Sequence, residues 1–144
     1  MNVGTILAAK GATVQTVTPS ATVSTVVQKL KLHGIGALVV SHDGRAVQGI
    51  VSERDVVQGL AAHGPDLLET TVDGIMTRSV ETCGRDRSVA DVMTLMTARR
   101  IRHVPVVEDD ALCGMISIGD VVKHRLVETE AEAQALRDYV LAGH

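Results

Sequence analysis

The chain repeats itself, and this internal repeat constrains its fold more than any other feature of the sequence. When residues 13–60 are placed beside residues 79–125, the two stretches match at an offset of 66, which becomes 65 after a polar turn. The matched pairs include Val14 with Val80, Val23 with Val89, Ile35 with Ile101, Gly49 with Gly114, Ser52 with Ser117 and Asp55 with Asp120. Most matches are apolar, so we predict one structural unit that is folded twice with the same inward faces.

Each copy predicts the element order β-α-β-β-α. Apolar residues at helical spacing predict helices, and two apolar runs around a tight polar turn predict a β-hairpin. In the first copy we expect an extended piece at 14–17, a helix from near Ser20, a hairpin of 37–40 with 47–51, and a helix from Ser52. In the second copy we expect an extended piece at 80–83, a helix from near Ser88, a hairpin of 104–107 with 112–116, and a helix from Ser117. Gly34 is expected to end the first of these helices, because glycine tolerates the left-handed conformation.

Size then predicts how the copies are arranged. A unit of about 50 residues buries too little surface to be stable alone. We therefore predict an α/β (α+β) fold in which two β-α-β-β-α repeats pack about a pseudo-twofold axis. The expected boundaries are 3–62 for repeat 1, 63–78 for a linker and the entry to repeat 2, 79–127 for repeat 2, and 128–144 for a C-terminal helical extension.

Two features lie outside the repeated unit. Pro65 and the stretch 66–69 predict a short helix in the linker. In the long C-terminal helix, a narrow apolar stripe is formed by Leu126, Ala133, Leu136 and Val140. Two heptads are too short to indicate a coiled coil. The stripe therefore either packs against its own domain or forms a dimer contact.

Composition excludes several classes of protein. Tyr139 is the only aromatic residue, so a flat ligand must be held between aliphatic side chains. A net charge of −3 gives no electrostatic attraction to nucleic acid or to acidic membranes. The basic cluster Arg99, Arg100, Arg102 and His103 is consistent with a solvated helix end or with a nucleic-acid contact, and the acidic chain argues against the latter.

The chain lacks the patterns of secretion, membrane insertion and metal binding. Its two cysteines form no CxxC motif, and its histidines show no metal-ligand spacing. The N-terminus does not resemble a signal peptide, and there is no run of about 18 apolar residues. We expect reduced cysteines, a cytoplasmic location, and no contact with a membrane.

Both copies contain Gly-h-h-Ser-x-x-Asp, where h is apolar, at a strand-to-helix junction. The two motifs are residues 49–55 and 114–120. Ser followed three residues later by an acid is close to a helix capping box, so one interpretation is purely structural. The same geometry suits a ligand, since a helix N-terminus attracts phosphate and a carboxylate accepts hydrogen bonds from a ribose diol. Arg54 beside the first motif offers a fork for phosphate.

The combined pattern resembles a CBS-domain pair, also called a Bateman module. The resemblance covers about residues 3–127 and rests on the doubled unit and both motifs. It also rests on Arg102-His103-Val104-Pro105-Val106 and on Gly74-Ile75-Met76-Thr77, which opens copy two. The stretch from Ser52 to Val57 is similar to that of the stand-alone bacterial members.

The resemblance implies a set of ligands and contact residues. Such pairs bind adenosyl ligands between the repeats, here AMP foremost, with ATP, ADP, NAD and S-adenosylmethionine as alternatives, and they associate as flat dimers. Asp55 and Asp120 would bind ribose, with Ser52 and Ser117 as their partners. The strands that contact the base would be Gly36, Ala37 and Leu38 in copy one, and Arg102, His103, Val104 and Pro105 in copy two. Thr16, Val17, Thr82 and Cys83 would line the base pocket.

We therefore expect a non-catalytic regulatory module that senses an adenosyl ligand and passes its state to an unknown partner protein. A ligand-independent interaction or oligomerisation module is the alternative. No catalytic cofactor is expected, and no nucleophile and base can be named; His103 is open to interpretation as a base, as a pocket residue or as a packed residue. Because the copies differ at Arg54 and Gly119, we expect the cleft with Asp55 and Arg54 to prefer a phosphorylated ligand.

Overall fold

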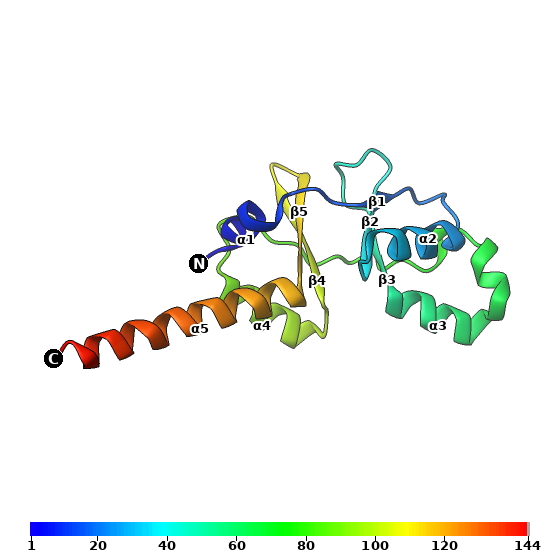
Figure 1. The fold of residues 1–144 in the computed structure, drawn as a ribbon. Coiled ribbons are helices and arrows are strands. Elements are labelled where there is room, and N and C mark those ends of the chain that lie inside the picture. The colour runs from blue at the N-terminus through cyan, green and yellow to red at the C-terminus, as the bar shows by residue number, and fades with distance from the viewer. Residues whose placement is uncertain (144) are drawn as a thin grey trace.

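The computed structural model describes residues 1–143 and shows the predicted repeat as two α/β halves side by side, with one long helix projecting from the second half (Figure 1). The first half contains β1 (Thr16–Val17), α2 (Val23–His33), β2 (Ala37–Val40), β3 (Gly49–Ser52) and α3 (Glu53–His63). The second contains α4 (Val89–Arg99), β4 (His103–Glu108), β5 (Ala111–Ser117) and α5 (Ile118–Leu141). Three further pieces precede the halves, namely α1 (Val3–Lys10), η1 (Gly64–Glu69) and η2 (Val72–Gly74). His144, the last residue of the predicted extension, lies outside the described part.

The sheets of the two halves differ by one strand. In the first half β1 pairs parallel with β2, and β2 pairs antiparallel with β3. In the second half β4 pairs antiparallel with β5, and the extended piece expected at 80–83 pairs with β4 only through a single parallel bridge between Cys83 and Val106. Cys83 N–H donates to the Pro105 carbonyl, but the next ladder bond would need an N–H on Pro105 itself. Proline has no N–H, so the ladder stops there.

Local signals set most helix ends. Ser88, Ser52 and Ser117 are N-caps, and Gly34 ends α2 in the left-handed conformation with φ of 61°, as predicted. The first helix starts later than expected, because residues 18–21 form a turn and Thr22, rather than Ser20, accepts the capping hydrogen bond from Thr25 N–H.

The segment before each repeat packs on the other repeat. Val3, Ile6 and Leu7 of α1 lie in the core of the second half, whereas Leu67 and Val72 lie in the core of the first. The predicted boundary at 3–62 follows chain order, but α1 is held by the second half. This exchange ties the two halves together, because neither apolar core is complete without a segment that crosses over.

Two equivalent glycines make the exchange possible. A Cβ on Gly114 would lie 2.6 Å from Leu7 Cδ1, and a Cβ on Gly49 would lie 2.6 Å from Met76 Sδ. A larger residue at either position would force the side chain of Leu7 or Met76 to shift, since real Cβ atoms do not come that close. The sequence match between Gly49 and Gly114 thus reflects a shared packing requirement.

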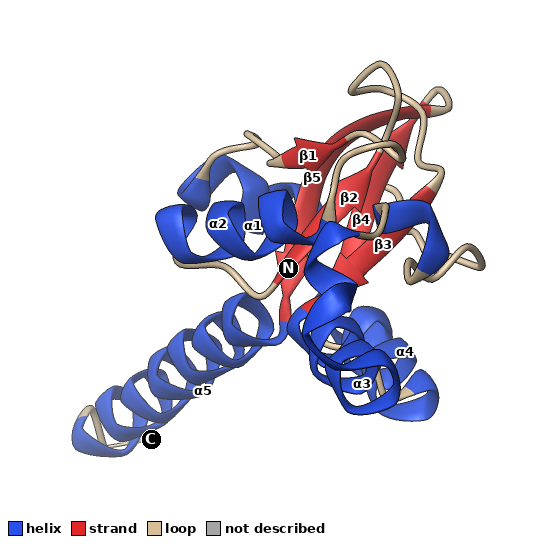
Figure 2. Cartoon of the chain, turned by 90° about the vertical axis from the view of Figure 1, so that its right-hand side faces the viewer, coloured by secondary structure: helices blue, strands red, loops and turns tan. Residues whose placement is uncertain are grey.

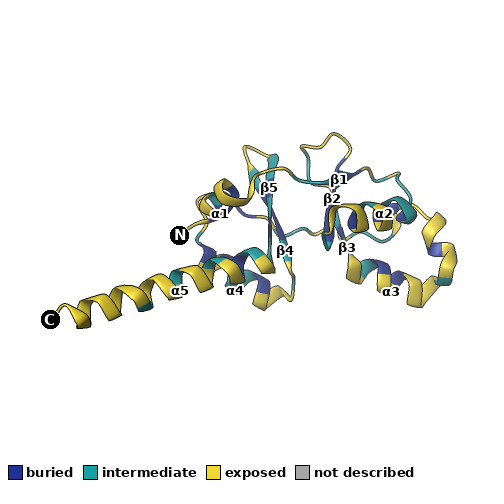
Figure 3. Ribbon diagram, in the orientation of Figure 1, coloured by how far each residue is buried: buried dark blue, intermediate teal, exposed yellow. Residues whose placement is uncertain are grey.

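Helix α4 ends, and α3 and α5 begin, at the same end of the strands in both views, and α5 then extends away from both halves (Figure 2). Its apolar stripe does not pack against its own domain, so that interpretation is wrong for this chain. Leu126, Leu136 and Val140 are 58%, 64% and 63% exposed (Figure 3). Within residues 1–143, no helix combines the length and the apolar character that crossing a bilayer would require.

Candidate functional site

Two clefts lie along the seam between the halves, and equivalent residues line them. Each has a volume of about 310 Å³, which is at the lower end of the range for small-molecule sites. The first cleft opens at the start of α3 and takes residues 79–81 and 99–103 from the second half. The second includes Ser117, before the start of α5, and takes residues 13–15 and 34–37 from the first half. The pseudo-twofold relation predicted from the repeat is therefore built into both clefts.

The serine and aspartate of each motif form a capping box at their helix. Ser52 N–H and Oγ–H donate to Asp55 Oδ2 at 2.8 and 3.1 Å, and Ser117 N–H and Oγ–H donate to Asp120 Oδ2 at 2.9 and 3.0 Å. The structural interpretation of the motif is thus correct, and it leaves the other oxygen of Asp55 without a hydrogen bond from the described residues. Capping therefore holds this carboxylate at the cleft and leaves one of its oxygens available to a ligand.

The backbone of each helix start is partly satisfied within the protein. Glu53 N–H donates to the Gly36 carbonyl at 3.0 Å, and Ile118 N–H donates to the Arg102 carbonyl at 2.8 Å. Two N–H groups in the first turn of each helix are therefore already bonded, counting the one that the capping serine accepts. Recognition of a ligand at these helix starts depends on side chains more than on free backbone donors.

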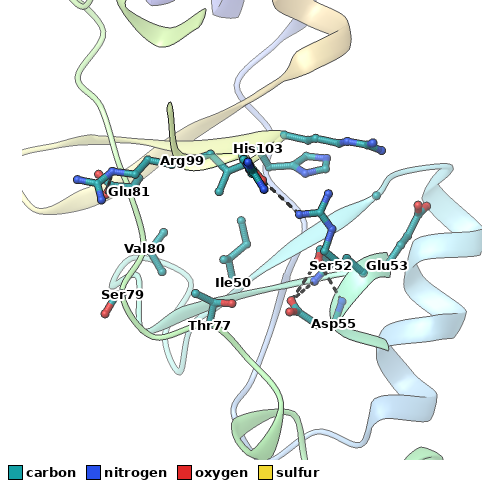
Figure 4. Close-up of a pocket in the computed structure, with 15 residues that line it drawn as sticks. Ile50, Ser52, Glu53, Asp55, Thr77, Ser79, Val80, Glu81, Arg99 and His103 are labelled. Atoms are coloured by element: carbon teal, nitrogen blue, oxygen red, sulfur yellow. Dashed lines mark hydrogen bonds and ion pairs between the residues drawn. The ribbon is translucent and has the colours of Figure 1, made fainter. Parts of the chain in front are cut away.

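The first cleft is rich in charge. The predicted basic cluster faces it, since Arg99, Arg100, Arg102 and His103 all line its wall, together with Arg54 from the other half. Arg54 Nη1 donates to the Arg100 carbonyl at 3.2 Å and so crosses the seam. Arg99 Nε lies 3.4 Å from Glu81 Oε1. In Figure 4 Ser52 and Asp55 lie at one side of the space, Val80 lies at the opposite side, and Ile50 lies between them.

His103 belongs to both clefts. It lines each of them opposite Gly36, where an added Cβ would come within 3.2 Å of His103 Cε1. Burial lowers the pKa of His103; the negative charge of Glu53 opposes this shift, and the positive charges of Arg102 and Lys10 add to it. The imidazole is therefore neutral at pH 7, with one nitrogen as donor and the other as acceptor.

In the second cleft a lysine stands in front of the aspartate. Lys10 Nζ donates to Asp120 Oδ2 at 2.7 Å and to the Met115 carbonyl at 2.8 Å. Burial alone would raise the pKa of Asp120, but Lys10 and the N–H and O–H of Ser117 hold it below its usual value. Lys10 lines this cleft, whereas Asp120 does not, so the cleft presents an ammonium group where the first presents a carboxylate.

The structure brings together about half of the predicted contact residues. Those that line a cleft are Gly36, Ala37, Ser52, Arg54, Asp55, Arg102, His103 and Ser117. Those that line neither are Thr16, Val17, Leu38, Thr82, Cys83, Val104, Pro105 and Asp120. Val17, Leu38 and Val104 are 4%, 0% and 0% exposed because they face the apolar cores.

The incoming chain passes the cleft before it enters the sheet, so residues 13–15 and 79–81 take the places expected of 16–17 and 82–83. Residues 13–15 and 79–81 match each other at the offset of 66, and this match was the signal in the sequence that could have identified them as cleft residues. Lys10 has no counterpart in the repeat, and nothing in the sequence indicated its role.

Neither a metal centre nor a disulfide is found in the described residues. No group of three or more His, Cys, Asp and Glu in residues 1–143 is arranged to hold a metal ion. Cys83 and Cys113 are free thiols, and burial raises the pKa of Cys83 to about 11. Such a thiol is protonated at neutral pH and unreactive.

Comparison with known proteins gives one consistent result. The family model described as "CBS domain" matches residues 12–62 and again residues 72–127. A mitochondrial CBS domain-containing protein of Arabidopsis thaliana is 39% identical over 127 residues, which covers 85% of this chain and 62% of that protein. The chain thus spans less than two thirds of this relative.

Solved structures agree. A CBS-domain-containing protein from Agrobacterium tumefaciens is 42% identical with a TM-score of 0.84, and the match covers 87% of this chain and 99% of that one. A CBS domain pair solved in complex with 5′-methylthioadenosine and S-adenosyl-L-methionine is 25% identical with a TM-score of 0.73, covering 85% of this chain and 98% of that one.

Proposed function

The chain belongs to the CBS-domain family, and on this premise we propose that it is a non-catalytic regulatory module that binds an adenosyl ligand between its two repeats. AMP is the foremost candidate, with ADP, ATP and NAD as alternatives. The observation that carries the proposal is the position of Asp55, whose carboxylate lines the first cleft with one oxygen tied to Ser52. A carboxylate held in this way accepts hydrogen bonds from the two hydroxyls of a ribose.

The rest of the first cleft suits the other parts of a nucleotide. Arg54 and the arginines at 99, 100 and 102 place positive charge beside the carboxylate, which favours a phosphate group. Ile50, Val80 and Ile101 line the same cleft and offer aliphatic contacts to the faces of a base. Neutral His103 offers one donor and one acceptor for a base edge.

The proposal is supported by the relative solved with 5′-methylthioadenosine and S-adenosyl-L-methionine, two ligands that share an adenosyl group. That protein shares the fold over most of this chain. For the present chain the ligand is a proposal, as are the absence of catalysis, the homodimer and the cytoplasmic location predicted from the sequence.

Ligand binding is proposed to act on a partner by shifting the angle between the halves. The first cleft takes residues from both halves, and Arg54 of one half already contacts Arg100 of the other. A ligand shifts such an equilibrium only by its difference in affinity for the two arrangements. The partner protein would read the surface that changes.

The test is ligand binding by the full chain with a charge-neutral variant of the key residue. Thermal unfolding with AMP, ADP, ATP, NAD and adenosine should show stabilisation of about 2.7 kcal/mol at a ligand concentration near 100 times Kd. Asp55→Asn keeps an oxygen for Ser52 but loses the charge, and it should weaken binding of the best ligand about tenfold or more by titration calorimetry. Asp66→Asn, an exposed carboxylate on η1, is the matched control. If Asp55→Asn binds like wild type, this role for Asp55 is wrong.

A second candidate is a ligand-independent interaction module, and the exposed apolar residues favour it. Val57 and Leu60 on α3, and Val122 and Leu126 on α5, are 64%, 39%, 49% and 58% exposed. Flat thermal shifts with every adenine compound would support it, if light scattering or ultracentrifugation also showed an oligomer lost on substitution of Val122 and Leu126 by Ser. Thermal shifts that depend on ligand would contradict it.

A further inference from the structure

The two clefts are unequal, and we propose that Lys10 makes them so. It occupies the ribose-binding carboxylate of the second cleft, so that the chain binds one nucleotide, in the first cleft. This inference rests on the proposed function and adds a stoichiometry and a specificity-determining residue to it.

The difference lies at the two carboxylates. Asp55 lines its cleft, and no cationic side chain in the described residues pairs with it. Asp120 has the same capping bonds to its serine, but its Oδ2 also accepts from Lys10 Nζ at 2.7 Å, and Lys10 rather than Asp120 lines the cleft. A ribose diol that reaches Asp120 from the cleft therefore has to compete with an ammonium group that is already bonded to the carboxylate.

Only the second cleft has such a lysine, because the segment before the first repeat is longer than the segment before the second. Leu7 and Met76 take equivalent places against Gly114 and Gly49. From Leu7 to Val14 the chain is three residues longer than from Met76 to Val80, the matched position. The added residues extend α1 to Lys10, whereas η2 ends at Gly74. Gly11, with φ of 95°, then turns the chain back toward the cleft.

The ion pair outcompetes a sugar. The lysine and aspartate side chains are 36% and 21% exposed, so their attraction is only partly screened by water. A charge-assisted hydrogen bond is about twice as strong as a neutral one, and a ribose hydroxyl is a neutral donor. A diol that displaced Lys10 would also leave the ammonium with only the Met115 carbonyl as a partner in the described structure.

The other charged residues that line the two clefts also favour nucleotide binding in the first cleft. The first cleft has four arginines, of which Arg99 is paired with Glu81, and a carboxylate that no cation in the described residues pairs with. Among the residues that line the second cleft, Lys10 is the only Lys or Arg, and its charge is neutralised by Asp120. The second cleft thus lacks both charged groups that a nucleotide would use.

The experiment is titration calorimetry of the full chain with AMP as the probe. Wild type should bind one AMP per chain. Lys10→Met keeps the aliphatic stem, frees Asp120, and should bind two, the second more weakly than the first because no arginine lines that cleft. Lys10→Arg retains the pair and should bind one. Lys31→Met, on the exposed surface of α2, is the matched control and should also bind one.

The outcomes separate the two proposals. Two AMP per wild-type chain, or one per folded Lys10→Met chain, would overturn the role of Lys10 while leaving the proposed function intact. No binding of AMP, ADP, ATP or NAD by any variant would overturn the proposed function, and this inference with it. If Lys10→Met does not fold, as judged by urea unfolding, Lys10→Gln takes its place, with Lys10→Gln plus Asp55→Asn expected to retain a single site.

Discussion

Lys10 and Asp120 lie 110 positions apart in the sequence, yet Lys10 Nζ and Asp120 Oδ2 are 2.7 Å apart. The pair joins the last residue of α1 to the first turn of α5, two helices that pack on the same half. The ion pair thus helps to hold α1 on the second half, and it also occupies the carboxylate of Asp120.

The first prediction concerns the strength and pH dependence of this pair. A double-mutant cycle of Lys10→Met and Asp120→Asn should give a coupling free energy of about 1 kcal/mol at pH 7, measured by urea unfolding. Because the folded-state pKa of Asp120 is depressed, the coupling is fully present above the unfolded pKa of about 4 and is lost as the pH falls through the folded pKa. A coupling that does not weaken as the pH falls below about 4, or none at pH 7, would contradict the ion pair.

The second prediction concerns Arg54 and phosphate. Arg54→Ala should weaken AMP binding about tenfold or more while changing adenosine binding much less, because only AMP offers a phosphate to the guanidinium. Arg45→Ala, on an exposed turn outside both clefts, is the control. Equal losses for AMP and adenosine in calorimetry would show that Arg54 acts on cleft shape through its bond to the Arg100 carbonyl instead.

The third prediction concerns the exchanged segment. Gly114→Ala should cost about 1–3 kcal/mol in the free energy of unfolding, because the new methyl group would overlap Leu7. Leu7→Ala alone opens a cavity and costs about 2–5 kcal/mol. The double variant should lose clearly less than the sum of the two, since each change relieves the other.

Gly74→Ala is the matched control, because no atom lies within 4 Å of its added Cβ. It should leave the midpoint of urea unfolding almost unchanged. Strictly additive losses for Gly114→Ala and Leu7→Ala would mean that α1 does not pack on β5 in solution.

The fourth prediction concerns His103. Burial, Arg102 and Lys10 lower its folded-state pKa, against the opposing charge of Glu53. The unfolded chain then binds more protons below about pH 6.5, so stability declines as the pH falls from that value toward the folded pKa and is constant above it. His103→Gln should lose less stability than wild type between pH 7.5 and 5.5 in urea unfolding. The exposed His33→Gln is the control, and it should decline as wild type does.

Local signals in the sequence were sufficient for the elements of each half. Ser52, Ser88 and Ser117 cap helices as predicted, because a serine side chain satisfies orphan N–H groups wherever a helix starts. The hairpins are also where two apolar runs flank a polar turn. The extended piece expected at 80–83 pairs with β4 only at Cys83, and the sequence pattern did not indicate this, because the missing N–H of Pro105 matters only when another strand lies beside it.

For the clefts, the sequence predicted the motif residues better than the strand residues. Asp55 and Arg54 follow a capping pattern that is read locally, and both line the first cleft. Leu38 and Val104 were predicted as contacts, and because their side chains face a core, only their backbone groups could take that role. Which residues of a passing strand face the seam depends on how the halves are rotated against each other, and no local pattern contains that rotation.

By itself, the sequence determined that this protein is one α/β unit folded twice, with a capped carboxylate at each second helix. These features arise from contacts between residues close in the chain, so periodicity and spacing record them. Only the tertiary structure decided that the two carboxylates are unequal, because Lys10 reaches Asp120 through a helix that packs on the distant half. An ion pair between remote residues depends on the path of the whole chain, and no repeat in the sequence shows it.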